Sequence, residues 1–282
     1  MPLVTSKEML CKAQKGKYAV GAFNVENMEM AQAVIAAAED LNAPVIVQTT
    51  PGTLKYASPE LYYANVSALA KNAKVPVALH LDHGSSFELC VRALRAGYTS
   101  IMIDGSKLAL TENIALTRKV VEMCAPAGVP VEGEIGRVGG KEDDTQDSGT
   151  GYTIPAEAVR FEKETGLSSM AVGVGTAHGV YKTTPVLNTP LIGELKSMLT
   201  VPMVLHGASG LSDEAIRECI ERGICKVNFA TELRIAYTDG VKELLKEKSG
   251  AFDPKAYGSV GRSRVEEQVK NRMRVCGCCG RA

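Results

Sequence analysis

The sequence has no excess of either charge and no long apolar run. Lys and Arg together number 32, and so do Asp and Glu. The chain therefore has no excess of positive charge of the kind that binds nucleic acid. No apolar run approaches the roughly 20 residues that span a bilayer, and the first residues lack the charged and then apolar regions of a signal peptide. We therefore expect a cytoplasmic protein that binds neither nucleic acid nor membrane.

A secreted disulfide framework is also not indicated. The eight cysteines are spread over a chain of 282 residues, which is too long for a small disulfide-bonded scaffold. Cys90, Cys124, Cys219 and Cys225 fall in helix-like or strand-like segments and are expected to be reduced core thiols. The tail around residues 276–279 has no second Cys/His pair at zinc-site spacing, so we predict a reactive tail without a function.

Strand-like and helix-like segments alternate along the whole chain. This order predicts a single domain over residues 1–282, an α/β (β/α)₈ TIM barrel with a C-terminal helical extension at 253–282. A doubly wound open sheet is the second candidate, but no Gly-x-Gly-x-x-Gly follows the first strand. The expected strands are 18–23, 44–49, 75–81, 99–104, 129–134, 169–174, 201–205 and 224–229. Helices are expected at 27–41, after Ser58, at 86–96, 112–124 and 155–165, and after Ser212 and Thr231.

Histidine is scarce, and three of the four histidines follow strand-like runs. His83, His178 and His206 would therefore meet at the carboxyl ends of barrel strands, with Glu134 from the fifth strand. Three imidazoles around one open position are typical of catalytic zinc. His80 is an odd number of residues from His83, so we expect it to point to the opposite face and to be structural.

Three further features accompany this group. Asp82 precedes a candidate ligand and could orient it, act as a general acid or base, or be structural. Ser85-Ser-Phe-Glu88 has the form of a capping box, so a helix should begin there. The long polar segment 136–153 could form a lid.

Glycine-rich loops follow the sixth and seventh strands, and a polar strand end follows the eighth. Such loops and helix starts bind phosphate in this fold. A Lewis-acid metal beside a phosphate site suits a small phosphorylated carbonyl compound, because the metal would polarise the carbonyl and stabilise an enediolate. The segments concerned are 173–179, 206–210 and 228–231.

Six motifs, in order and over essentially the whole chain, resemble the class II, zinc-dependent ketose-bisphosphate aldolases of the tagatose- and fructose-bisphosphate type. They are His80-Leu-Asp-His-Gly84, Val131-Glu-Gly-Glu-Ile-Gly136, Gly139-Gly-Lys-Glu-Asp-Asp144, Gly175-Thr-Ala-His-Gly179, Leu205-His-Gly-Ala-Ser-Gly210 and Lys226-Val-Asn-Phe-Ala-Thr-Glu232.

The resemblance implies roles for particular residues. Zn²⁺ would be held by His83, His178 and His206, with Glu134 as a ligand in an alternative, deeper position. Asp82 would move the proton of the C4 hydroxyl, and Glu142 would exchange the proton at C3 of dihydroxyacetone phosphate. A monovalent cation, Na⁺ or K⁺, would lie near Gly179 and Gly207. The phosphate would be bound by Gly179, Lys182, Gly207, Ala208, Ser209, Asn228, Phe229, Ala230 and Thr231.

The reaction implied is reversible cleavage of tagatose or fructose 1,6-bisphosphate to dihydroxyacetone phosphate and glyceraldehyde 3-phosphate, by a homodimer or homotetramer. The residues that would bind the far end of the sugar are less well defined. Ser106-Lys107-Leu108 departs from the family's usual Ser-His before a Pro-aromatic pair. Ser259 stands where some members have an Arg that reaches the neighbouring subunit's site, and Arg262 is close enough in sequence to substitute for it.

Other readings remain open from the sequence. The same mechanism could act on a sulfofructose phosphate or a deoxy-keto-gluconate phosphate. A zinc hydrolase on the same barrel would activate water instead, and a non-catalytic subunit would stabilise a partner, although all the expected ligands are present. Lys182 or Lys226 could in principle form an imine, but an imine lysine needs no group of three imidazoles.

Overall fold

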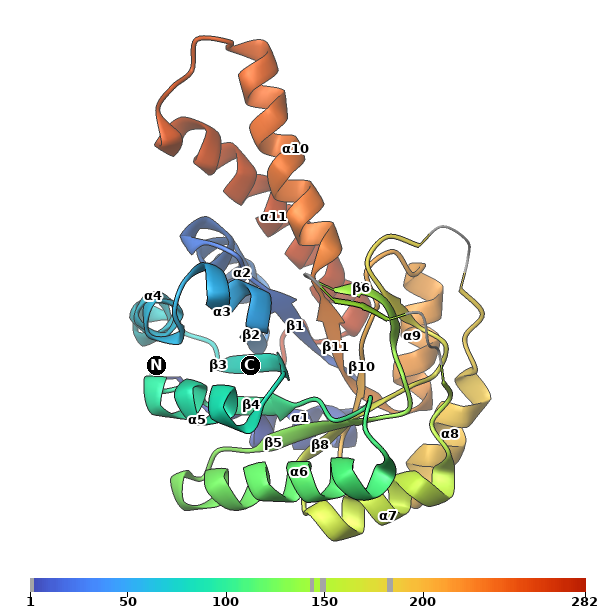
Figure 1. Ribbon diagram of the computed structural model, residues 1–282. Helices are drawn as coiled ribbons and strands as arrows, with labels where there is room; N and C mark the ends of the chain where they lie inside the picture. The colour runs from blue at the N-terminus through green and yellow to red at the C-terminus, as the bar shows by residue number, and fades with distance from the viewer. Residues whose placement is uncertain (1–2, 143–144, 148–150, 182–184) are drawn as a thin grey trace.

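Eight parallel strands close into a barrel, as the alternating pattern predicted. The computed structural model describes residues 3–142, 145–147, 151–181 and 185–282, apart from the side chains of 141, 142 and 145–147. Around the barrel the strand order is β1-β11-β10-β8-β5-β4-β3-β2 (Figure 1). These strands are β1 (Val20–Asn24), β2 (Val45–Thr49), β3 (Val77–Gly84), β4 (Ser100–Ile103), β5 (Val131–Ile135), β8 (Ser169–Val172), β10 (Met203–Leu205) and β11 (Ile224–Phe229).

The strands form where short apolar runs are enclosed on both faces. Each described barrel strand is buried nearly throughout, as expected for a parallel sheet covered by helices. The helices covering the barrel were predicted in part. The predicted ones are α2 (Met28–Asp40), α4 (Pro59–Asn72), α5 (Phe87–Ala96), α6 (Leu110–Cys124), α7 (Pro155–Thr165), α9 (Asp213–Arg222) and α10 (Thr231–Glu247).

Several elements had no counterpart in the sequence analysis. These are α1 (Ser6–Gly16), α3 (Pro51–Tyr56), the 3₁₀ turn η1 (Ala125–Ala127) and α8 (Thr189–Met198). The capping-box prediction was wrong by one residue. Ser86, not Ser85, is the N-cap of α5, and its side chain accepts a hydrogen bond from the Leu89 N–H at 3.2 Å.

The long polar segment after β5 forms a small second sheet at the mouth of the barrel. Its order is β7-β6-β9, with β6 (Gly139–Glu142) antiparallel to β7 (Thr145–Asp147) and parallel to β9 (Ala177–His178). Gly140 lies directly against His178: a Cβ at Gly140 would sit 2.2 Å from the His178 carbonyl oxygen. The segment proposed as a lid is thus attached to the strand that carries one of the candidate ligands.

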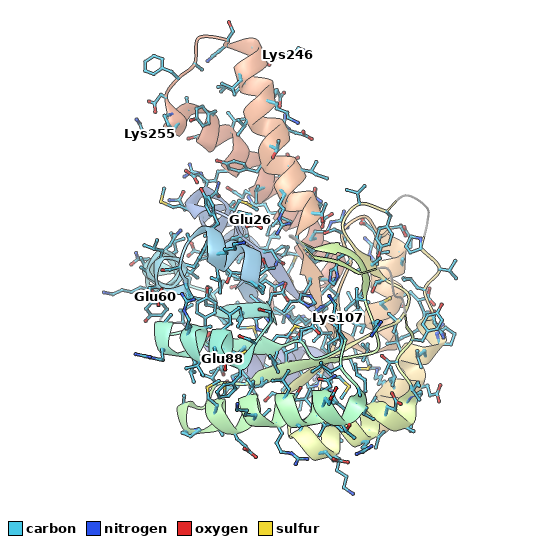
Figure 2. The ribbon with its side chains drawn as sticks, in the orientation of Figure 1. Glu26, Glu60, Glu88, Lys107, Lys246 and Lys255 are labelled. Carbon is cyan, nitrogen blue, oxygen red and sulfur yellow. The ribbon has the colours of Figure 1, made fainter. Side chains whose placement is uncertain are left out.

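The C-terminal extension is a long helix, α11 (Pro254–Cys276), which pairs with α10. Figure 1 shows the two helices running together away from the barrel, and Figure 2 shows Lys246 and Lys255 at their outer end. The tail after α11 returns to the barrel. The prediction of a reactive tail is wrong for Cys276 and Cys278, because both are buried and burial raises the pKa of each thiol, that of Cys278 to about 12.

Among the described residues, no helix is both long enough and apolar enough to cross a membrane.

Gly84 is the point at which β3 leaves the barrel, and the packing there allows no side chain. A Cβ would lie 2.3 Å from the Met102 carbonyl oxygen and 3.0 Å from Cys90 Sγ. We expect Gly84→Ala to lower the free energy of unfolding by about 1–3 kcal/mol, as overpacked sites do. Gly193→Ala, within α8 where nothing lies within 4 Å, should instead raise it by about 0.5–1 kcal/mol.

Urea unfolding of both variants measures this pair. A Gly84→Ala protein as stable as the parent would show that the close approach of β3 to Met102 is not a constraint on the fold.

Candidate active site

Three imidazoles meet at the carboxyl ends of the barrel strands. His83 is on β3, His178 on β9, and His206 follows β10. One nitrogen from each lies within 4.8 Å of the others, so the three could hold a single metal ion. Their ring centroids are 4.6 Å apart for His83 and His206, and 4.9 Å apart for His83 and His178. The structure therefore brings together the histidines singled out in the sequence.

A local irregularity places His83 in this group. The residue has a φ of 47°, and the register of β3 against β4 shifts between Leu81 and Gly84. The side chains of Asp82 and His83 can therefore both face the centre of the barrel, which strict alternation forbids. The expectation that His80 and His83 point to opposite faces is wrong for the same reason: His80 Nε2 is 3.8 Å from Glu132, which in turn contacts His206.

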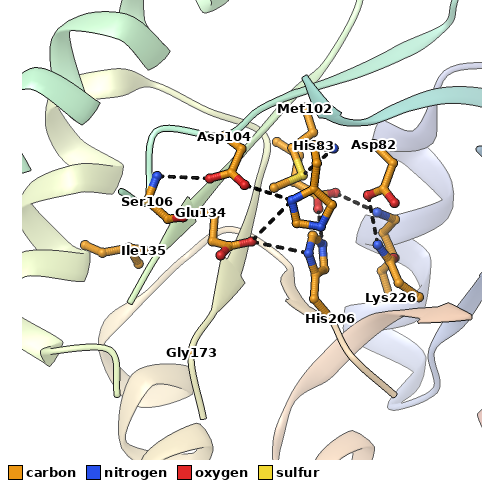
Figure 3. A network of polar contacts seen from close by, with 12 residues as sticks. Asp82, His83, Met102, Asp104, Ser106, Glu134, Ile135, Gly173, His206 and Lys226 are labelled. Carbon is orange, nitrogen blue, oxygen red and sulfur yellow. Dashed lines mark hydrogen bonds and ion pairs between the residues drawn. The ribbon is translucent and has the colours of Figure 1, made fainter. Parts of the chain in front are cut away.

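Carboxylates orient two of the imidazoles. Asp104 Oδ2 is 2.9 Å from His83 Nδ1 (Figure 3). Glu132 Oε1 is 2.9 Å from His206 Nε2. Metal-binding histidines in proteins commonly carry such a carboxylate on the ring nitrogen opposite the metal. The bonds leave His83 Nε2 and His206 Nδ1 as the nitrogens available to an ion.

The remaining polar atoms also fit a metal. His206 is fully buried, and its Nδ1 lies 3.3 Å from Glu134 Oε2. Within the described part of the chain neither atom makes a well-formed hydrogen bond. Buried polar atoms are costly without a partner, and an ion between them would provide one. Glu134 also groups with His83 and Asp104 as a second possible set of ligands.

Asp82 is fixed beside the imidazoles by three amides. Asn24 and Gln48 donate to its Oδ2 at 2.9 and 3.1 Å, and Asn228 donates to its Oδ1 at 3.0 Å. Burial acts to raise the pKa of this carboxyl, but the facing His83, His206 and Lys226 outweigh it and lower the pKa to about 2. Asp82 is therefore an ionised carboxylate at neutral pH, and its three hydrogen bonds fix its position.

A buried ion pair lies beneath the site. Lys226 Nζ is 2.9 Å from Glu132 Oε2, and both side chains are almost completely buried. The ammonium and the imidazoles hold the pKa of Glu132 well below its usual range although burial opposes this. His80 is held neutral, since burial and Lys226 lower its pKa to about 3. Lys226 is thus engaged with Glu132 and does not line the pocket described next, which disfavours an imine role.

A small hollow adjoins the imidazoles. It lies over the start of α10, whose first backbone N–H groups favour an anion. Ser209 Oγ accepts a hydrogen bond from the Ala230 N–H at 3.1 Å and so joins the two loops that form its wall. The hollow, which we call the anion pocket, is lined by Asn24, His178, Gly179, Gly207, Ser209, Asn228, Ala230, Thr231 and Arg234.

A protein-family model described as fructose-bisphosphate aldolase class-II matches residues 4–281. The chain belongs to this family. The solved structure of the YdjI aldolase from Escherichia coli K12 is 36% identical to this aldolase, with a TM-score of 0.89 and 99% of both chains covered. A putative fructose-1,6-bisphosphate aldolase from Coccidioides immitis is 30% identical, with a TM-score of 0.88 over 97% of this chain and 96% of that one.

A third structure, the fructose-bisphosphate aldolase of Campylobacter jejuni, has a TM-score of 0.84 at 22% identity and supports the fold; the match covers 100% of this chain and 97% of that one. The chain is therefore a class II aldolase, a carbon–carbon lyase on a TIM barrel. Enzymes of this family are generally metal-dependent, and the His and carboxylate groups of this site could hold the ion.

Not every residue expected to bind phosphate lines the anion pocket. Ala208 and Phe229 are buried in the hydrophobic core, and Phe229 stacks on Phe23 with ring centroids 5.5 Å apart. Lys182 and the side chain of Glu142 lie outside the described residues. Ser259 and Arg262 are on α11, where Ser259 bonds the Lys255 carbonyl and Arg262 bonds Gln32, so neither belongs to this site in its own chain.

Several residues of the aldolase site were missed. Asn24 and Gln48 are polar residues within or at the end of otherwise apolar strands, and this signal could have identified them. Glu132 lies two residues before Glu134, so strand alternation places both on the same face. Arg234 lines the anion pocket and pairs with Glu26 through its Nε at 2.8 Å. Arg234 lies one turn into α10, and no comparable pattern in the sequence identifies it.

The bond from Asp104 to His83 predicts an effect on metal affinity. Asp104→Ala removes the group that fixes the His83 ring, and loss of such a partner typically weakens metal binding about 10- to 100-fold. Competition between the metal-free protein and a chromogenic chelator measures this. Glu164→Ala is the control, because Glu164 pairs with Arg160 on the surface. Equal metal affinity in the Asp104→Ala protein and the parent would refute the orienting role.

Proposed function

We propose that this aldolase reversibly cleaves a ketose 1,6-bisphosphate, fructose or tagatose 1,6-bisphosphate, to dihydroxyacetone phosphate and glyceraldehyde 3-phosphate, with Zn²⁺ as cofactor. One observation carries the proposal. The metal group, the proton acceptor and the anion pocket are contiguous: His178 belongs to both the metal group and the pocket, and Asn228 lines the pocket while it binds Asp82.

His83, His178 and His206 would hold the zinc, with Glu134 as an alternative ligand. Three nitrogen ligands with neighbouring carboxylates suit Zn²⁺ better than Mg²⁺ or Ca²⁺, which prefer oxygen. When bound, the ion supplies Lewis-acid polarisation of a carbonyl oxygen. The carboxylates Asp104 and Glu132 keep the imidazoles in place for it.

Asp82 is the group we assign to the C4 hydroxyl proton. An aldol cleavage requires removal of that proton as the C3–C4 bond breaks, and Asp82 is ionised for this purpose. Its three amide donors fix its position, so the geometry needs no rearrangement at the moment of reaction. We assign Glu142, the last residue of β6, to the exchange of the proton at C3. In this proposal β6 belongs to the lid.

The anion pocket is assigned to the phosphate of the dihydroxyacetone phosphate half. Backbone N–H groups at the start of α10, the glycine-rich loops and the Ser209 hydroxyl are the donors a phosphate requires. We propose that Lys182 adds a positive charge there and that Na⁺ or K⁺ binds at the backbone near Gly179 and Gly207.

The far-end anion is proposed to be bound by a second copy of the chain. Ser259 and Arg262 lie on α11, which extends with α10 beyond the barrel (Figure 1). A homodimer or homotetramer could bring this arm to the mouth of a neighbouring barrel. The protein is proposed to act in the cytoplasm.

A substrate panel tests the proposal. The purified, zinc-loaded protein is assayed with fructose 1,6-bisphosphate, tagatose 1,6-bisphosphate, sulfofructose 1-phosphate and 2-dehydro-3-deoxy-6-phosphogluconate, and the triose product is identified. We expect dihydroxyacetone phosphate from one of the first two sugars. Release of inorganic phosphate without carbon–carbon cleavage would indicate a hydrolase and contradict the proposal.

Removal of the metal is expected to abolish turnover. Dialysis against a chelator should reduce cleavage to background, and Zn²⁺ should restore it. Without the ion, nothing polarises the substrate carbonyl. An aldolase that uses a lysine imine would keep its activity under these conditions. Metal content by mass spectrometry is measured in the same samples.

Asp82→Ala should reduce kcat by roughly 10²- to 10⁴-fold, the usual contribution of a positioned acid or base. Zinc content should be unchanged, since Asp82 is not a member of either possible ligand set. Steady-state kinetics and metal analysis of the variant separate the two effects. Full activity would show that another group moves the C4 hydroxyl proton.

A further inference from the structure

The hydroxyl of Tyr181 bridges the two loops that carry candidate metal ligands. It accepts a hydrogen bond from the Ala177 N–H at 2.8 Å and donates one to the Gly207 carbonyl at 2.7 Å. Ala177 immediately precedes His178, and Gly207 immediately follows His206. A single hydroxyl group therefore joins the chain neighbours of two imidazoles, one on β9 of the small sheet and one just after the barrel strand β10.

The two loops are in close contact at this bridge. Gly207 has a φ of +67°, and a Cβ on it would lie 2.6–3.0 Å from backbone atoms of Ala177. The Tyr181 ring covers Gly210, where a Cβ would be 3.2 Å from Cδ2 of the ring. The tyrosine thus fixes both the distance between the loops and the path of the second loop.

The same two loops form one side of the anion pocket. Gly179 belongs to the first loop, and Gly207 and Ser209 belong to the second. The bridge also reaches the small sheet at the barrel mouth, because Ala177 pairs with Gly139 of β6. Movement between the loops would therefore change three things together: the shape of the pocket, the distance between His178 and His206, and the position of β6.

The Tyr181 hydroxyl keeps its proton and so can act as the donor to Gly207. Burial raises the pKa of this phenol, although the hydrogen bond from the Ala177 N–H acts in the opposite direction. The phenol is thus both acceptor and donor at neutral pH. A phenylalanine at this position would fill the same space but could make neither hydrogen bond.

We propose that Tyr181 is a positioning residue whose hydroxyl holds the His178 loop against the His206 loop, and thereby sets the affinity of the site for a phosphate group and for the metal ion. The inference rests on the metal and phosphate sites of the proposed function. It predicts that the hydroxyl acts on binding at both sites at once, through the separation of the loops.

Tyr181→Phe tests this with readouts that do not require turnover. The protein is loaded with Co²⁺, whose visible spectrum reports ligand geometry, and is then titrated with inorganic phosphate by calorimetry. We expect the dissociation constant for phosphate to rise about tenfold, the Co²⁺ bands to change, and Zn²⁺ to pass to a chelator about tenfold faster. In steady-state assays KM should rise by a larger factor than kcat falls.

Tyr98→Phe is the matched control. Tyr98 is buried, and its hydroxyl bonds Thr49 Oγ1 at 2.8 Å, away from the anion pocket. This variant should lose a similar amount of thermal stability and keep the parent's phosphate affinity and Co²⁺ spectrum.

The outcomes separate the two proposals. If the unmodified protein binds neither Co²⁺ nor phosphate, the proposed function fails. If it binds both, and Tyr181→Phe binds both equally well, the role of Tyr181 is refuted. Equal changes in the Tyr181→Phe and Tyr98→Phe proteins would also overturn it, because they would show a general loss of stability.

Discussion

The site depends on imidazoles that are held in place by carboxylates inside the barrel. His83 is bound by Asp104 and His206 by Glu132, each at 2.9 Å. A histidine can offer either ring nitrogen to a metal, and the hydrogen bond at the other nitrogen decides which one. The carboxylates thus determine where an ion can be bound, and the position of the ion determines where a substrate carbonyl can lie.

This arrangement requires several buried charges, and they compensate one another. Glu132 has Lys226 as its ion-pair partner, and Asp82 has three amide donors. A buried charge without a partner is strongly unfavourable, so removal of one member is more damaging than loss of a surface pair. The ionised state of Asp82 follows from its neighbours, since their positive charge exceeds the effect of burial on its pKa.

The sequence was sufficient for the barrel and for the elements that carry the site. Eight short apolar runs predicted the eight strands, and the position of His83, His178 and His206 after such runs predicted that they would meet. It was not sufficient for the local geometry of β3. The positive φ of His83 and the register shift beside it allow Asp82 and His83 to face the same centre, and strict alternation could not predict this.

Contacts between distant segments could also not be predicted from the sequence. Glu132 meets Lys226 across 94 residues and Asp82 meets Asn228 across 146, so only the closed barrel defines these pairs. The tail cysteines show the same limit. Their spacing indicated a reactive tail, whereas Cys276 and Cys278 pack into the core.

The geometry of the site leads us to expect one divalent ion bound by imidazoles from three separate segments of the chain. Anomalous diffraction at the zinc absorption edge, from crystals grown with Zn²⁺, tests it most directly. We expect one strong peak about 2.0–2.1 Å from a ring nitrogen of each of His83, His178 and His206. No peak among these rings or near Glu134, with zinc bound elsewhere or absent, would contradict it.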